Sequence, residues 1–258
     1  MDIDRRFGGI ARLYGQDGLS RFLGAHVAVI GVGGVGSWVV EALARSGIGA
    51  ITLFDLDHIA ESNVNRQLHA VEGAFGQAKV TAMAQRVLAI HPDCCVIPVE
   101  AFVDEENLEE VIQGGFDYVV DCIDSYRTKA ALIASCRRHK VRIITIGGAG
   151  GQTDPTRIRL ADLSRSEQDP LLSKTRKLLR REYGFPANTK RRFDVPCVYS
   201  GEQQVYPSPE GEVCLDRPGT LEGSLNCGGY GSAMTVTATF GLVAVSHLLK
   251  KLAADTSA

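Results

Sequence analysis

The chain has 258 residues, of which 45% are hydrophobic and 22% charged, and its formal net charge is −2. This ordinary globular composition excludes a fibrous or wholly disordered protein, and the near-neutral charge confines any nucleic-acid site to a local patch. At this length we expect a single domain over residues 1–258 rather than two independent domains.

The N-terminal segment, residues 1–25, has no apolar signal-peptide core, so we expect a cytoplasmic protein. The chain carries seven cysteines, an odd number, and no two of them form a Cys-x-x-Cys pair. This spacing argues against a disulfide framework and against a four-cysteine zinc site. We therefore expect reduced thiols and no zinc.

Residues 26–147 alternate apolar, strand-like runs with helical patterns. Such alternation predicts an α/β, Rossmann-like, doubly wound fold whose mostly parallel sheet has helices on both faces. Ligands of these folds bind at the carboxyl ends of the strands, so residues 26–151 form the expected nucleotide-binding core. The expected strands are 26–30, 50–54, 95–99, 116–121 and 141–146, and the expected helices are 35–46, 75–90, 104–113 and 126–139.

The first expected strand ends in a glycine turn formed by Gly31, Gly33, Gly34 and Gly36. Glycine makes such a turn at low cost, and the helix that follows presents unpaired N–H groups with partial positive charge. These donors favour a phosphate, so the turn predicts a nucleotide without saying which one. Asp55 ends the second strand and suits ribose hydroxyls. The alternative is a purely structural turn beside a solvated aspartate.

Three charged residues downstream of the turn favour a triphosphate over a dinucleotide. Arg66 and Lys79 can neutralise β and γ oxygens and stabilise charge on the leaving pyrophosphate. Asp124 ends the fourth strand, where it can hold a magnesium ion bound to the phosphates. An NAD oxidoreductase or a nucleotide-sensing module, the alternative class, leaves these residues without a role. Singly, each of them is typical of a solvated surface group.

After residue 151 the regular pattern gives way to a polar, proline-bearing stretch over residues 152–226. We expect this stretch to face the substrate and to include a flexible basic crossover segment. Residues 174–192 hold eight Lys or Arg and one Glu, which predicts contacts with nucleic-acid phosphates, while Tyr183 and Phe185 can stack on a base. The alternative is a solvated helix face. The basic residues are Lys174, Arg176, Lys177, Arg180, Arg181, Lys190, Arg191 and Arg192.

Residues 227–258 return to an apolar helical pattern. Within them, residues 230–249 carry no Lys, Arg, Asp or Glu over a length able to span a bilayer. Many small and hydroxyl residues, together with His247, favour a buried helix against the sheet. Membrane association through residues 230–249 stays open as the alternative.

Taken together, the motifs of the first half resemble the ubiquitin-activating-enzyme-like adenylyltransferases, including those of thiamine and molybdopterin synthesis. The resemblance implies a homodimer that binds Mg-ATP and adenylates a carboxylate. It implies that Asp55 holds the ribose and that Asp124 is the magnesium-linked, catalytically needed acid. The phosphate-side residues are then Asn63, Arg66 and Lys79. The motifs are Gly31-x-Gly33-x-x-Gly36, Asp55-x-Asp57, Asn63-x-x-Arg66-Gln67, Gly76-x-x-Lys79 and Asp121-x-x-Asp124.

The N-terminal segment departs from that pattern. Several of these enzymes place an arginine there that reaches into the partner subunit's site, and the corresponding position in this chain is Gly9. We expect residues 1–25 to form a dimer and active-site arm, with Arg6 or Arg12 as the candidate for the cation supplied across the dimer. Whether a monovalent cation, Na⁺ or K⁺, occupies a structural site is left open.

The second half resembles one branch of that superfamily, the tRNA threonylcarbamoyladenosine dehydratases. The resemblance implies ATP-dependent activation of the threonyl carboxylate on a modified adenosine beside the anticodon, followed by ring closure that releases AMP. The alternative is an enzyme that adenylates the C-terminus of a small sulfur-carrier protein, which gives the basic segment no role. The residues that carry the resemblance are 148–156, 169–171, 195–202 and 227–241.

Two cysteines are candidates for a reactive thiol. Cys197 lies in the expected crossover, where related enzymes that form thioesters or persulfides place such a group, and Cys227 begins the glycine-rich return to the sheet. A thiol needs a low-pKa environment for this role, and the alternative is a pair of buried, inert cysteines. The sequence leaves open whether a cysteine desulfurase or a sulfur-acceptor protein docks here.

Overall fold

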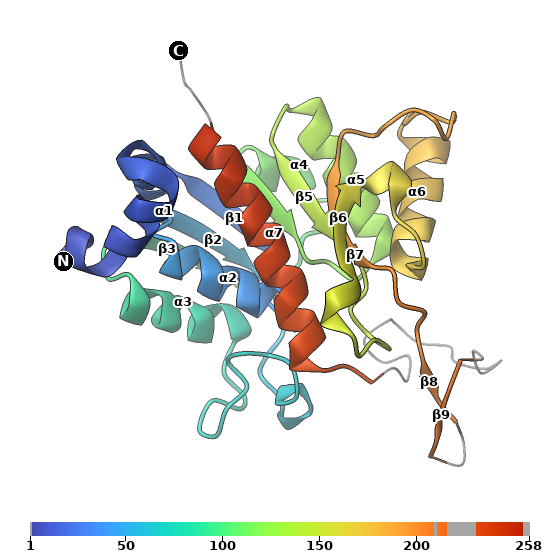
Figure 1. The fold of residues 1–258 in the computed structure, drawn as a ribbon, viewed down its shortest axis with the longest axis horizontal. Helices are drawn as coiled ribbons and strands as arrows, with labels where there is room; N and C mark the ends of the chain where they lie inside the picture. The colour runs from blue at the N-terminus through green and yellow to red at the C-terminus, as the bar shows by residue number, and fades with distance from the viewer. Residues whose placement is uncertain (1, 209–210, 216–230, 255–258) are drawn as a thin grey trace.

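A seven-stranded sheet forms the centre of the computed structural model, which describes residues 2–208, 211–215 and 231–254 (Figure 1). Its strand order is β3-β2-β1-β4-β5-β7-β6, and every neighbouring pair is parallel except the antiparallel pair β6 and β7. The expected doubly wound α/β fold is thereby confirmed. The strands are β1 (His26–Ile30), β2 (Ala50–Phe54), β3 (Cys95–Val99), β4 (Tyr118–Asp121), β5 (Ile143–Ile146), β6 (Ile158–Asp162) and β7 (Pro196–Ser200).

Helices cover both faces of this sheet and bury two separate apolar layers against it. One face carries α1 (Ile3–Gly24), α2 (Gly36–Arg45), α3 (Lys79–Ile90) and α7 (Met234–Ala254), and the other carries α4 (Leu108–Ile112), α5 (Tyr126–Arg138) and α6 (Pro170–Glu182). Short pieces complete the described chain: the 3₁₀ turns η1 (Glu61–Asn63), η2 (Pro155–Arg157) and η3 (Leu163–Arg165), and the hairpin of β8 (Tyr206–Pro207) and β9 (Val213–Cys214).

The elements of the first half agree with the expected ones, apart from their ends. Strands β1, β2 and β3 have the expected bounds, whereas β4 and β5 each begin two residues late. The greatest difference lies in α4, where a turn replaces the first part of the expected helix over residues 104–113. In that turn Asp104 Oδ1 accepts hydrogen bonds from the backbone N–H groups of Glu106 and Asn107. A side chain that bonds the local backbone in this way competes with helix formation.

The second half is more regular than its sequence indicates. Instead of a flexible crossover, residues 170–182 form helix α6, whose N-cap Asp169 accepts a hydrogen bond from Leu172 N at 2.9 Å. Four leucines of α6 are buried, and the helix packs on α5. Phe185, a candidate for base stacking, is also buried and meets Phe193 edge to face at 5.0 Å between ring centroids. The prediction of flexibility in this stretch and that of an exposed Phe185 are therefore wrong.

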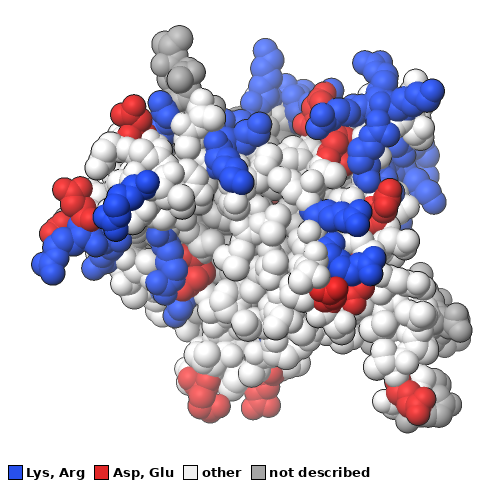
Figure 2. All heavy atoms as spheres, viewed as in Figure 1, with Lys and Arg blue, Asp and Glu red and all other residues white. Residues whose placement is uncertain are grey.

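The charged residues of α6 gather toward its C-terminal end. Figure 2 shows Lys and Arg concentrated over the part of the surface where Figure 1 places α6 and its following loop. Two of them serve the fold, because Arg176 donates to Ser166 Oγ and Arg180 stacks on Phe193 at 5.0 Å. The exposed members are Lys174, Lys177, Arg181, Lys190, Arg191 and Arg192.

Helix α7 is long and apolar enough, by length and composition, to cross a membrane. In this fold, however, 56% of its most apolar window is buried, and the helix packs against α1 and α2. The described part of the segment 230–249 thus has the expected place of a helix against the sheet (Figure 1).

A buried ion pair joins β4 to α5 beneath the carboxyl ends of the strands. Lys129 Nζ lies 2.8 Å from Asp121 Oδ2, and neither side chain is exposed to solvent. Thr145 of β5 donates to the same carboxylate oxygen at 2.6 Å. Charges in such a place remain only when they are paired and hydrogen-bonded, so these contacts fix the junction of three elements.

We expect Lys129→Met to lower the free energy of unfolding by about 3–5 kcal/mol, because it leaves the Asp121 carboxylate buried without its cation. The matched control is Arg138→Ala, which breaks an exposed pair with Glu109 and should cost about 0–1 kcal/mol. Urea denaturation of both variants measures the difference. Equal losses in the two variants would contradict this role of the buried pair.

Candidate active site

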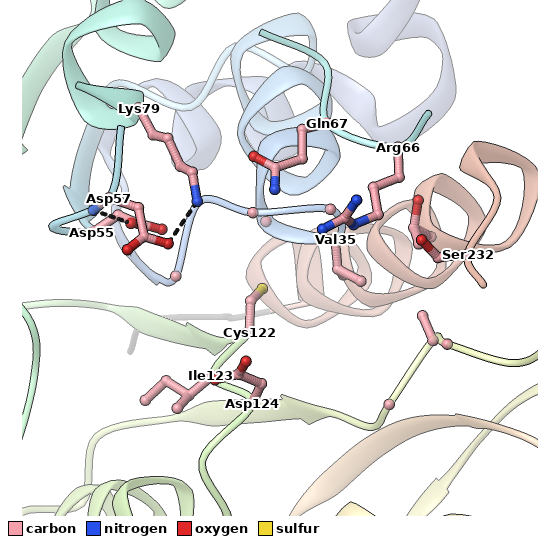
Figure 3. Close-up of a pocket in the computed structure, with 18 of the residues that line it drawn as sticks. Val35, Asp55, Asp57, Arg66, Gln67, Lys79, Cys122, Ile123, Asp124 and Ser232 are labelled. Atoms are coloured by element: carbon pink, nitrogen blue, oxygen red, sulfur yellow. Dashed lines mark hydrogen bonds and ion pairs between the residues drawn. The ribbon is translucent and has the colours of Figure 1, made fainter. Parts of the chain in front are cut away.

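A cavity of about 720 Å³ opens at the carboxyl ends of β1, β2, β4 and β5 (Figure 3). Its walls come from the residues that directly follow each of these strands: the glycine turn after β1, Asp55 after β2, Cys122 to Asp124 after β4, and Gly147 to Gly150 after β5. The volume is typical of a small-molecule site, and its position is the one expected for doubly wound folds.

The glycine turn brings the start of α2 onto the end of β1. Gly31 has a φ of +89°, and its N–H donates to Phe54 O at 2.8 Å. A Cβ on Gly36 would lie 1.8 Å from Gly31 O, so only glycine fits there. No described side chain caps α2, and Gly34, Val35 and Gly36 line the cavity. Ser37 N already donates to Gly33 O at 3.0 Å, so the N–H groups offered to an anion are those of the turn itself, from Gly34 to Gly36.

Asp55 stabilises the turn as well as lining the cavity. Its Oδ2 accepts a hydrogen bond from Val32 N at 2.7 Å, and its Oδ1 accepts one from Asp57 N at 2.9 Å. The side chain is largely buried, and this burial raises the pKa of the carboxyl. Because each carboxylate oxygen has two acceptor positions, Asp55 can hold the backbone and still accept from ribose hydroxyls.

Lys79 is the first residue of α3, and the helix directs its side chain toward the glycine turn (Figure 3). Its Nζ lies 2.7 Å from Asp57 Oδ2. Only 6% of the Lys79 side chain is exposed, against 54% for Asp57. The cavity therefore holds a shielded ammonium group whose partner is a half-exposed carboxylate, an arrangement in which a phosphate can replace Asp57.

Arg66 lies on the other side of the turn from Lys79 (Figure 3). Its stem packs so closely on Gly34 that a Cβ there would come within 3.1 Å of Arg66 Cγ. The guanidinium donates to Ser62 O at 2.9 Å and to Asn65 Oδ1 at 3.0 Å. Trp38 Nε1 donates to Arg66 O at 3.0 Å, which fixes the backbone of this loop to α2.

The position of Asn63 differs from the one that the resemblance implies. Asn63 is buried and does not line the cavity, because its Oδ1 accepts a hydrogen bond from Ala60 N at 3.1 Å. It shapes the 3₁₀ turn that presents the following residues. Asn65 and Gln67 line the cavity instead, and Asn65 O accepts from Met234 N at 3.1 Å at the start of α7.

Asp124 faces the glycine turn from the opposite wall (Figure 3). The loop that carries it is held by Asp121, whose Oδ1 accepts a hydrogen bond from Ile123 N at 3.1 Å. Within residues 2–208, 211–215 and 231–254, no three His, Cys, Asp or Glu side chains gather as a metal site. A magnesium ion at Asp124 would thus depend on phosphate oxygens for most of its ligands.

Several lining residues were not identified from the sequence: Asn65, Gln204, Ser232 and Thr237. They come from loops and from the start of α7. Asn65 lies inside the motif Asn63-x-x-Arg66, and Ser232 and Thr237 lie within residues 227–241, but at positions to which these motifs give no role. Gln204, for example, is one polar residue in a polar stretch, yet the fold brings it against Gly150, where its Nε2 donates to the carbonyl at 3.0 Å. The one signal in the sequence that could have indicated such a close approach is the glycine-rich run over residues 147–151.

Three sets of predicted residues lie outside this cavity. Arg6 and Arg12 are exposed on α1, and Arg6 donates to Ile90 O at 2.6 Å. The exposed basic residues of α6 and of the loop that follows it do not line the cavity. Cys197 is buried in β7, between β5 and the edge strand β6, rather than in a mobile crossover. Cys227 lies outside the described residues.

Burial decides the chemistry of Cys197. The side chain is fully enclosed, and burial, together with the charge of Asp169, raises the pKa of its thiol well above the usual value. Because the thiolate is the nucleophile, this environment makes Cys197 inert, as the alternative interpretation of the sequence has it.

Known proteins resemble this chain over nearly its whole length. The ThiF family matches residues 7–258. The chain is 51% identical over 253 residues to the tRNA threonylcarbamoyladenosine dehydratase of Escherichia coli, covering 97% of this chain and 94% of that protein. The protein of the same name from Haemophilus influenzae is 50% identical over 250 residues, with coverages of 96% and 94%. The crystal structure of the E. coli enzyme in complex with ATP is similar with a TM-score of 0.87 and 48% identity, covering 98% of this chain and 96% of that chain.

We expect iodoacetamide to alkylate the exposed Cys95 in the native protein and to spare Cys197. Alkylation of Cys197 should be roughly a hundredfold slower or more, since it requires local unfolding of β7. Peptide mapping by mass spectrometry at pH 8 measures both rates, and the same reaction in denaturant, where the two thiols should react alike, is the control. Native labelling of Cys197 at the rate of Cys95 would show that the strand opens freely.

Proposed function

Because the chain belongs to the ThiF family, we propose that it is an ATP-dependent tRNA dehydratase that acts on the threonylcarbamoyl group of the adenosine next to the anticodon. The observation that carries the proposal is a single cavity in which the start of α2, Lys79 and Arg66 face Asp124. The full-length similarity to named dehydratases supplies the substrate. The reaction would take place in the cytoplasm.

The cavity gives the ribose and the phosphates of ATP matching groups. The ribose lies at Asp55, and the phosphates lie at the glycine turn between Lys79 and Arg66. Magnesium, held by phosphate oxygens with Asp124, would neutralise further charge on the triphosphate. The threonyl carboxylate then attacks the α-phosphorus in line, and Lys79 and Arg66 stabilise the charge that builds on the leaving pyrophosphate.

The second step needs little from the protein. In the acyl-adenylate the activated carbonyl and the carbamoyl group belong to the same side chain, so ring closure proceeds at high effective molarity and expels AMP. No enzyme nucleophile is required, which agrees with the enclosed position of Cys197. A sulfur-acceptor partner and a monovalent cation have no support among the described residues, and neither is part of the proposal.

The tRNA contacts extend from the cavity along α6. The first turn of α6 lies at the cavity, since Asp169 accepts from Gly148 N at 2.9 Å, whereas its basic end and the following loop lie near the amino ends of the strands. Thirteen residues of helix separate the two by about 20 Å. An RNA stem over the basic end can therefore place a base of its loop at the cavity.

A homodimer belongs to the proposal because α1 lies outside the cavity of its own chain. Arg6 and Arg12 are exposed on this helix, so either of them can reach a phosphate only across a subunit interface. This would complete the set of cations on the pyrophosphate side.

The test is incubation with ATP, Mg²⁺ and tRNA that carries the threonylcarbamoyl group. We expect the nucleoside to lose one water by mass spectrometry, with one AMP released for each conversion. ATP–pyrophosphate exchange that depends on a small protein with a diglycine end, and not on tRNA, would instead support the sulfur-carrier alternative and overturn this proposal.

In that assay we expect Lys79→Met and Asp124→Asn each to lower the rate of AMP release by about 10²–10³-fold, the usual cost of one group that stabilises transition-state charge. The matched control is Lys251→Met, an exposed lysine at the end of α7, which should leave the rate unchanged. Wild-type turnover by either site variant, with native circular dichroism, would remove that residue from the mechanism.

We expect the double variant Lys177→Ala/Arg191→Ala to bind tRNA more weakly and to lower the slope of log affinity against log salt by about 1.5–2. Both side chains belong to the exposed basic residues of α6 and its following loop, and each would neutralise one phosphate. Lys250→Ala/Lys251→Ala removes the same charge from the end of α7 and should keep the wild-type slope. Identical slopes for both double variants would show that the exposed basic residues of α6 and its loop do not contact tRNA phosphates.

A further inference from the structure

A second cavity, of about 350 Å³, adjoins the ATP cavity at the first turns of α6. Its walls include Asp169, Ser173 and Arg176 from α6. Gln204 lines both cavities. Neighbouring residues of α6 divide between them, since Leu171 faces the first cavity and Ser173 the second. A ligand whose reactive end lies in the first cavity can therefore extend into the second.

Gln204 leaves an acceptor unused at this shared wall. The residue is only 6% exposed, and its Nε2 donates to Gly150 O at 3.0 Å. Its Oε1 has no hydrogen-bond partner anywhere in the described part of the chain. The atom is closed off from solvent, so a ligand that brings an N–H group within reach of it, with a small rotation of the Gln204 side chain, removes the cost of an unpaired buried acceptor.

Arg176 supplies the complementary donors. Its guanidinium is partly buried and donates to Ser166 Oγ, and a guanidinium carries five N–H groups in all. The charge of Asp169 lies close enough to act on Arg176, and the Asp169 carboxylate is itself held by Leu172 N and Gly148 N. The cavity thus offers donors and an acceptor with nearly balanced charge, which suits a neutral planar group that has both N–H and C=O.

A urea-type link joined to a purine has this chemistry. We propose that the second cavity binds the carbamoyl link and the adenine base of the modified nucleoside, with Gln204 and Arg176 as the residues that determine specificity for it. This inference rests on the proposed function, because it takes the threonyl carboxylate to lie at the α-phosphate in the first cavity. The first cavity then binds the threonyl carboxylate of the modified nucleoside, and the second binds its carbamoyl link and adenine base.

The test compares binding of two tRNAs, with and without the threonylcarbamoyl group, in the presence of a non-hydrolysable ATP analogue. Gln204→Ala removes the acceptor, and Ser173→Phe fills the second cavity from a position that does not line the first. We expect the wild type to prefer the modified tRNA and each variant to lose about tenfold of this preference. Ser173→Phe, whose position does not line the first cavity, should keep its affinity for the ATP analogue within about twofold. Native circular dichroism shows that Gln204→Ala is folded.

Lys177→Ala is the comparison for the loss of a phosphate contact, since this exposed residue of α6 lines neither cavity. It should weaken binding of both tRNAs in proportion and keep the preference. If Ser173→Phe and Gln204→Ala keep the wild-type preference and dehydrate the modified tRNA normally, the assignment of the second cavity is overturned while the proposed function stands. If the wild type itself shows neither preference nor loss of water, the proposed function fails.

Discussion

The geometry of the ATP cavity depends on a fully buried ion pair between a lysine and an aspartate. Lys129 and Asp121 pair at 2.8 Å with no solvent exposure, and Thr145 completes the shell of the carboxylate. Because an unpaired charge is so costly there, β4, α5 and β5 are held in one relative position. The other carboxylate oxygen of Asp121 accepts from Ile123 N. Asp121 therefore both pairs with Lys129 in the core and positions the loop that places Asp124 at the cavity.

Positive groups lie on one side of the cavity and a carboxylate on the other, an arrangement that suits the cleavage of a triphosphate. Donors and cations come from the β1–α2 turn, from Lys79 at the start of α3, and from Arg66, while Asp124 stands on the opposite wall (Figure 3). A redox dinucleotide needs no cation pair beside its pyrophosphate, whereas a leaving pyrophosphate does. The pair with Asp57 holds the Lys79 ammonium group at the cavity, where in the proposed function a phosphate would replace the carboxylate.

Local signals in the sequence predicted most of the nucleotide half, because a glycine turn, a strand end and a helix start each position their own side chains. Gly36, Asp55 and Lys79 therefore lie where the sequence places them. The misses depend on contacts between distant segments. Packing between distant segments decides whether the Asn63 side chain faces the ligand or the backbone of Ala60, and whether Cys197 is buried. No local sequence pattern predicts this packing. In α6 the signal was present: buried leucines at 171, 172, 178 and 179 follow a helical period, but the density of charge obscured it.

In the proposed function, helix α6 would connect recognition of the RNA backbone with the chemistry. Its first turn lines both cavities, its exposed basic residues run from Lys174 to Arg181 and continue in the following loop, and its leucine face is fixed on α5. The helix would set the distance between phosphate contacts at its C-terminal end and the cavities at its first turn, about 20 Å along its axis. A flexible basic loop would bind tRNA as strongly but would leave the base free to miss the α-phosphate. In the proposed function, the packing of α6 on α5 would thus turn a non-specific electrostatic contact into a means of positioning one nucleotide.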